Sequence, residues 1–97
     1  MGQVKTVGKH KTTIYSRSNK GREYTCVLYQ QTEVVIFSSA AIMLDSDGWR
    51  TATTKTRMNQ ASNQFNLGYY VYQKNYEWFV DFRGKTLEFE DGMVLTR

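Results

Sequence analysis

The 97-residue chain contains no proline, a single cysteine and a single histidine. Without proline, no segment is excluded from a helix interior or a central strand on that ground. Cys26 has no partner for an internal disulfide, and its alternating apolar surroundings predict a buried core thiol, compatible with a reducing cytosol. One cysteine and one histidine are too few for a structural zinc site, so we expect neither a metal nor a cofactor.

Long hydrophobic runs are also missing. No apolar stretch approaches the length of a membrane span, and the first residues do not resemble a signal peptide, so we expect no membrane partner. Gly84-Lys85-Thr86 lacks the earlier glycine of a phosphate-binding loop. Asp45-Ser46-Asp47-Gly48 lacks the further acids of a calcium loop and predicts a turn instead.

Groups that could carry catalysis are few. His10 lies in a basic segment, where no third group would hold it against a nucleophile. The carboxylates of Asp81, Glu88 and Glu90 could approach each other across strands, but their alternation with apolar residues favours a solvated sheet face. We therefore expect that the protein is not an enzyme.

Positive charge is concentrated at the N-terminus. Residues 1–22 contain six basic residues and no acid, whereas residues 23–97 contain seven basic and nine acidic residues, which leaves a net charge of +4. A basic arm favours contact with phosphates or with an acidic protein surface, the alternative being a solubilising, partly disordered terminus. We expect a flexible basic arm over residues 1–10 and one domain over residues 11–97.

Only one segment has the helical period. Apolar or small side chains recur at spacings of four, three and four residues, at Thr54, Met58, Ala61 and Phe65. This stripe predicts a helix over about residues 53 to 66. Thr51, Thr53 or Thr54 would cap its start, and Gly68 would cap its end.

Strand-like runs flank this helix on both sides. They cover residues 11–16, 23–29, 33–37 and 40–44 before it, and 69–73, 76–82, 86–90 and 93–96 after it. The last four predict a meander, with tight hairpins near Lys74-Asn75 and at Asp91-Gly92, the strongest such signal. The expected fold class is α+β: a single domain in which an antiparallel β-sheet packs against one α-helix.

The stretch Gly48-Trp-Arg-Thr-Ala-Thr-Thr-Lys55, followed by Arg57-Met-Asn59, resembles a family of small, largely uncharacterised proteins of tailed bacteriophages. The family pattern is a Gly-Gly-Trp turn, a Thr-x-Thr-Thr segment and an Arg-x-Asn on a helix. Asp47 stands where glycine is usual, and the resemblance covers about residues 23–97, without the basic arm. It implies a phage origin and the cytoplasm of an infected bacterial host, but no particular activity.

The leading hypothesis is a non-enzymatic, anti-CRISPR-like inhibitor that blocks a host nucleic-acid-processing or defence complex through protein contacts. Candidate anchors are Trp49, Tyr76 and Trp78, unless Trp49 folds back over the core. The full set of candidate binding residues is Trp49, Arg50, Lys55 and Arg57, with secondary electrostatic contacts from Lys9, Lys11, Arg17, Lys20 and Arg22.

Direct binding of DNA or RNA is the alternative. Free N–H groups at the helix start, basic side chains and threonine hydroxyls could contact phosphates. The amide side chains that could reach base edges are Asn59, Gln60, Asn63 and Gln64. The tyrosines that could stack on bases are Tyr69, Tyr70, Tyr72 and Tyr76. A structural virion component, and a homodimer formed by pairing of strand edges, also stay open.

Overall fold

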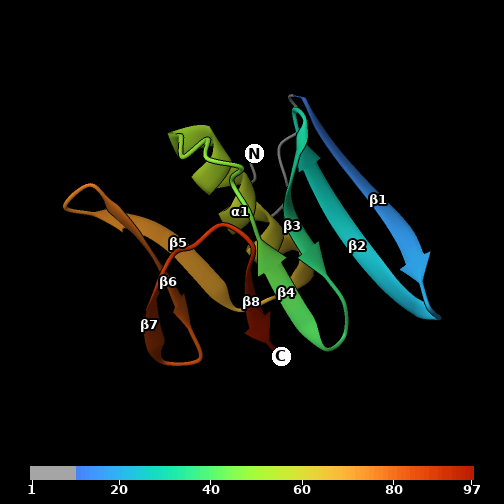
Figure 1. Ribbon diagram of the computed structural model, residues 1–97. Coiled ribbons are helices and arrows are strands. Elements are labelled where there is room, and N and C mark those ends of the chain that lie inside the picture. The colour runs from blue at the N-terminus through green and yellow to red at the C-terminus, as the bar shows by residue number, and fades with distance from the viewer. Residues whose placement is uncertain (1–10) are drawn as a thin grey trace.

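The computed structural model describes residues 11–97, which form one helix and two antiparallel sheets (Figure 1). In chain order the elements are β1 Thr12–Asn19, β2 Arg22–Tyr29, β3 Thr32–Phe37, β4 Ala41–Leu44, α1 Ala52–Phe65, β5 Tyr69–Lys74, β6 Glu77–Phe82, β7 Lys85–Glu88 and β8 Met93–Thr96. The predicted α+β fold class is confirmed. The expected basic arm, with Lys9 and His10, lies outside the described residues.

The helix begins and ends within one residue of its predicted bounds. Thr51 is extended, with φ −100°, and its hydroxyl oxygen accepts a hydrogen bond from the Thr54 N–H at 3.2 Å. This bond satisfies one of the free donors at the helix start. At the other end Asn66, in the left-handed conformation with φ 57°, caps the helix in place of the expected Gly68. Asparagine adopts this conformation more readily than most residues, so the cap lies two positions before the expected glycine.

The strands form a five-stranded sheet of order β1-β2-β3-β4-β8 and a three-stranded sheet of order β5-β6-β7. The hairpin predicted at Asp91-Gly92 is wrong, because β8 leaves the meander and pairs with β4. This pairing places Leu95 opposite Ile42, and both side chains are buried in the core. The pairing of β8 with β4 thus buries the apolar side chain of Leu95 in the core, which favours it over the local hairpin that was expected.

Two tight turns build the remaining meander. Asn75 and Tyr76 join β5 to β6 with φ of 52° and 67°, and Arg83 and Gly84 join β6 to β7 with φ of 53° and 77°. Positive φ at both central residues matches the right-handed twist of the strands. The hairpin expected near Lys74-Asn75 is confirmed.

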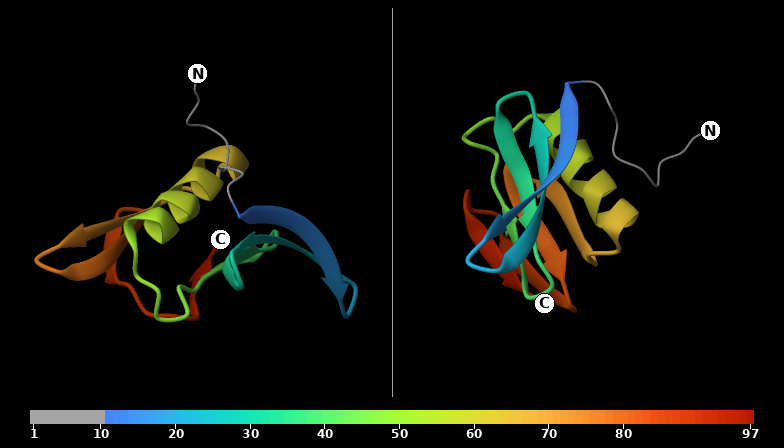
Figure 2. Two further views of the ribbon diagram at one scale, coloured as in Figure 1. Left: turned by 90° about the horizontal axis from the view of Figure 1, so that it is seen from above. Right: turned by 90° about the vertical axis from the view of Figure 1, so that its right-hand side faces the viewer.

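The core lies between the helix and the two sheets. The predicted stripe is buried at Thr54, Met58 and Ala61. Figure 2 shows the helix on one side of the strands, so each sheet keeps one face away from it. Cys26 is fully buried, as predicted, and burial raises the pKa of its thiol, although the nearby Arg17 charge opposes the shift. Among residues 11–97, no helix is long and apolar enough to cross a membrane.

Candidate binding site

The loop between β4 and α1 is held by a residue far along the chain. One oxygen of the Asp91 carboxylate accepts hydrogen bonds from the N–H and the hydroxyl of Ser46, at 2.8 and 2.6 Å. The other accepts the Gly48 N–H at 3.0 Å. The sequence gives no sign of this role, because an aspartate before a glycine indicates only a turn.

Ionisation of Asp91 is favoured by this arrangement. Partial burial works against the charged form, but the hydrogen bonds from Ser46 and Gly48 and the positive charge of Arg50 outweigh it, so the pKa of Asp91 lies below its ordinary value. A carboxylate that is charged at neutral pH makes stronger hydrogen bonds than a neutral acceptor. The loop is therefore fixed by a residue 45 positions away along the chain.

Within this loop, the backbone turns so that Trp49 faces solvent. Asp47 and Gly48 are both left-handed, with φ of 51° and 79°, and the Trp49 N–H donates to the Ser46 carbonyl at 2.9 Å. The Trp49 side chain is 68% exposed. The alternative in which Trp49 folds back over the core is therefore wrong.

Trp49 lines a groove of about 790 Å³ between this loop, the helix start and the β2–β3 turn. Lys11, Thr12, Tyr29 and Gln30 form the other side. Two of the predicted binding residues, Trp49 and Lys11, therefore line the same groove.

The basic residues at the helix start point to different sides. Arg50 lies over the Phe89 ring at 5.1 Å and Lys55 over the Trp78 ring at 5.6 Å. These two rings contact each other edge to face, with centroids 5.3 Å apart. Arg50 and Lys55 therefore share one aromatic surface.

Arg57 lies on the groove side instead. Its guanidinium sits over the Tyr29 ring at 5.6 Å, and it donates to the Thr12 hydroxyl and to the Gln60 carbonyl oxygen, each at 3.0 Å. The predicted cluster of Arg50, Lys55 and Arg57 is thus divided, and each cation has contacts within the protein.

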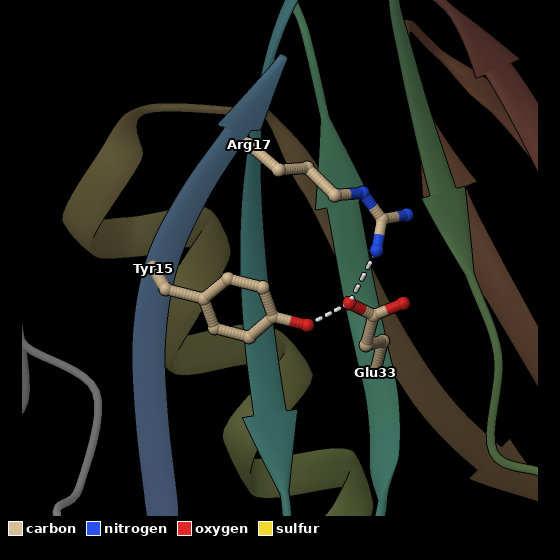
Figure 3. A network of polar contacts seen from close by, with 3 residues as sticks. All are labelled: Tyr15, Arg17 and Glu33. Carbon is tan, nitrogen blue, oxygen red and sulfur yellow. Dashed lines mark hydrogen bonds and ion pairs between the residues drawn. The ribbon is translucent and has the colours of Figure 1, made fainter. Parts of the chain in front are cut away.

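The other predicted cations are spread along the β1–β2 hairpin. Arg17 is bound to Glu33, with 2.8 Å between Nη1 and Oε2, and the same carboxylate oxygen accepts the Tyr15 hydroxyl proton (Figure 3). Lys20 and Arg22 are exposed at the far turn of this hairpin. An eight-residue strand spans about 25 Å, so these two lie well away from Lys11.

Several residues expected to contact nucleic acid are instead part of the fold. The amide of Asn59 donates to the Val71 carbonyl at 2.8 Å and accepts the Val71 N–H at 2.7 Å, as a neighbouring strand would. Tyr69 is buried, and its hydroxyl donates to the Met58 carbonyl at 2.6 Å. Burial also raises the pKa of Tyr69 far above its ordinary value. Neither Asn59 nor Tyr69 is therefore available to a ligand.

Exposure separates the remaining aromatic candidates. Trp78 is 5% exposed and belongs to the core, so its prediction as an anchor is wrong. Tyr76 is 95% exposed and Tyr70 is 57% exposed. Among residues 11–97, no three or more His, Cys, Asp or Glu side chains gather in a way that could hold a metal ion.

An exposed tryptophan on a fixed loop beside a groove is a geometry typical of a binding domain. The chain belongs to a phage protein family, the Kyanoviridae Gp96 protein family, which it matches over residues 2–96. The phage resemblance of the Trp49 segment is thus confirmed, and the match also includes the basic N-terminal residues that the resemblance had left out. No curated protein and no solved structure matches the chain.

Proposed function

We propose that this phage protein acts by binding, without catalysis, and inhibits or modulates a host nucleic-acid-processing or defence complex through protein contacts. Its setting would be the cytoplasm of the infected cell, and its role would resemble that of an anti-CRISPR protein. The observation that carries this proposal is the 68% exposure of Trp49 at a groove of about 790 Å³. A tryptophan contributes a large apolar area when a partner covers it, and tryptophan is enriched among the residues that dominate binding energy at interfaces.

The fixed loop supports the same role. The hydrogen bonds to Asp91 and the left-handed turn at Asp47 and Gly48 fix the backbone next to Trp49. A side chain that is already positioned loses less conformational entropy when it binds. The loop would thus present Trp49 to a partner without rearrangement.

The distribution of cations favours a protein partner over bare nucleic acid. Arg50 and Lys55 lie against one aromatic surface, whereas Arg57 lies on the groove side and already donates two hydrogen bonds. Binding to phosphates depends on several cations that act on one stretch of backbone. Arg50, Lys55 and Arg57 do not form such a continuous track.

Capture of host proteins tests the proposal. Tagged wild-type protein and the Trp49→Ala variant would be incubated with lysate of the host bacterium, and the recovered proteins compared by mass spectrometry. We expect a host protein complex that the wild type retains and that Trp49→Ala retains about tenfold less, or worse. Val94→Ala is the matched control, because Val94 is also exposed and apolar, at 60%, but lies in β8. Equal recovery by wild type and Trp49→Ala would contradict the role of Trp49.

Direct nucleic-acid binding is the second candidate, because Lys11 and Trp49 line one groove with Arg57 beside it. A nucleotide could stack on the indole while its phosphate met the ammonium group. Titration of labelled single- and double-stranded DNA and RNA at several salt concentrations tests this candidate. Phosphate contacts predict a linear fall of log affinity with log salt, and Lys11→Ala should reduce the slope by about one. Absence of binding at low salt would remove it.

A further inference from the structure

The outward face of the three-stranded sheet carries a row of aromatic rings. Tyr70 and Tyr72 stack with centroids 6.0 Å apart, and Tyr72 and Phe79 stack at 5.8 Å. Their strand neighbours Val71 and Val80 are buried in the core. Because side chains alternate along a strand, the three rings lie on the face opposite the core.

Carboxylates surround these rings on the same face. Asp81 is paired with Tyr70, Glu88 with Phe79, and Glu77 with Lys74. All three carboxylates are on exposed residues, and the Thr86 hydroxyl donates to one Asp81 oxygen at 2.9 Å. Within residues 11–97 the only ion pair joins Arg17 and Glu33, so no cation of the described chain neutralises them at salt-bridge distance.

This local charge is opposite to that of the whole chain. The protein carries +4, but the outward positions of β5–β7 hold three carboxylates and one ammonium group. Such a face repels phosphates and attracts cations. A solvated sheet face, as the sequence predicted for Asp81 and Glu88, accounts for the charge but not for three stacked aromatic rings.

We propose that this face docks a Lys- or Arg-rich segment of a protein partner. Cationic side chains would lie over ring faces at the two ends of this row, on Tyr70 and Phe79, where the ring quadrupole attracts them, and would donate to the carboxylates beside the rings. This inference rests on the proposed function and names the chemistry of the partner. Proteins that handle nucleic acids expose such basic segments to contact phosphates, so a host factor of this kind offers a matching surface.

The hairpin that bears the rings projects from the body of the molecule (Figure 1). At its turn, Tyr76 is 95% exposed and left-handed, with φ 67°. A bulky residue at this turn position costs free energy that glycine would avoid, so an aromatic side chain there fits a role in contact. Tyr76 would extend the aromatic surface at the free end of the hairpin.

The probe for this proposal is a labelled peptide of alternating Arg and Ala. Fluorescence anisotropy measures its affinity for the full chain, and backbone amide shifts of the ¹⁵N-labelled protein locate it. We expect binding that weakens with salt and shifts confined to β5, β6 and β7. Tyr70→Ala combined with Glu88→Gln should reduce the affinity about tenfold, because one ring and one carboxylate are lost.

Matched controls separate this face from other carboxylates and other ligands. Glu90→Gln removes another exposed carboxylate, just after β7, and should leave the affinity unchanged. A peptide of alternating Glu and Ala, and an oligothymidylate, should cause no shifts on this face.

Three results would overturn the inference: no binding at low salt, peptide shifts that map elsewhere, or an affinity that the double variant does not change. Shifts on this face with the oligothymidylate would assign it to single-stranded nucleic acid instead. The peptide assay does not depend on Trp49. If the peptide does not bind but host capture still depends on Trp49, this inference alone is overturned. If both experiments fail, the proposed function is overturned too.

Discussion

The carboxylate of Asp91 binds Ser46 twice, through the backbone N–H at 2.8 Å and through the hydroxyl at 2.6 Å. Asp91 lies between β7 of the three-stranded sheet and β8 of the five-stranded sheet, and Ser46 follows β4. Nearby, the Gly92 N–H donates to the Leu44 carbonyl at 2.9 Å. These bonds join the loop that carries Trp49 to the point where the chain passes from one sheet to the other.

Asp91→Ala should destabilise the fold by about 1–3 kcal/mol, because Ser46 is fully buried and its hydroxyl would lose its acceptor. Urea denaturation followed by circular dichroism measures the change in the free energy of unfolding. Glu90→Ala is the control, since its side chain is exposed, and should stay within about 0.5 kcal/mol of wild type. Equal effects of the two substitutions would show that the bonds to Ser46 and Gly48 contribute nothing to stability.

The contribution of Asp91 should depend on pH. Its pKa is lowered in the folded state, so the unfolded chain takes up a proton first as the pH falls. The added stability is therefore present above the ordinary pKa of 3.8 and is lost as the pH falls through the lowered folded-state value. We expect the advantage of wild type over Asp91→Asn to be constant near neutrality and to shrink in acid. Unfolding curves at several pH values measure it, and an advantage that grew in acid would refute the assignment.

Tyr76→Gly should stabilise the domain by about 0.5–1 kcal/mol. Asparagine followed by glycine is the preferred pair for a two-residue turn of this kind, and relief of the left-handed strain at Tyr76 exceeds the entropy that glycine adds to the unfolded chain. Thermal denaturation measures the change. Tyr76→Ala, which keeps a Cβ in the left-handed conformation, is the control and should give no comparable gain. A loss of stability in Tyr76→Gly would mean that the ring supports the fold.

Asn59→Ala should cost about 2 kcal/mol, because it leaves both the N–H and the carbonyl of buried Val71 without their partner. Asn63→Ala, on the exposed side of the same helix, is the control. It measures the stabilisation of about 0.5 kcal/mol that comes from the higher helix propensity of alanine alone. Chemical denaturation of both variants gives the difference. If Asn59→Ala were as stable as Asn63→Ala, solvent would replace the two hydrogen bonds to Val71 at no cost in free energy.

The elements that the sequence predicted well depend on neighbours along the chain. The helix follows from the spacing of Thr54, Met58 and Ala61 and from a threonine cap, and the first two hairpin turns of the meander follow from short polar or glycine-containing pairs. The candidate site was predicted only in part. Trp49 and Lys11 meet in one groove, but Arg50 and Arg57 lie on different sides of the helix, which no spacing in the sequence reveals.

Short-range periodicity and motifs were sufficient to predict the α+β class, the approximate positions of the helix and strands, and the phage relationship of the Trp49 segment. Tertiary structure alone decided which partner β8 takes, which of Trp49 and Trp78 stays exposed, and that Asp91 fixes the loop at Ser46. Strand partners, and the surfaces that cover a side chain, depend on contacts between distant segments. The sequence alone therefore does not show which of two tryptophans is buried, or which of two similar strands is the pairing partner of β8.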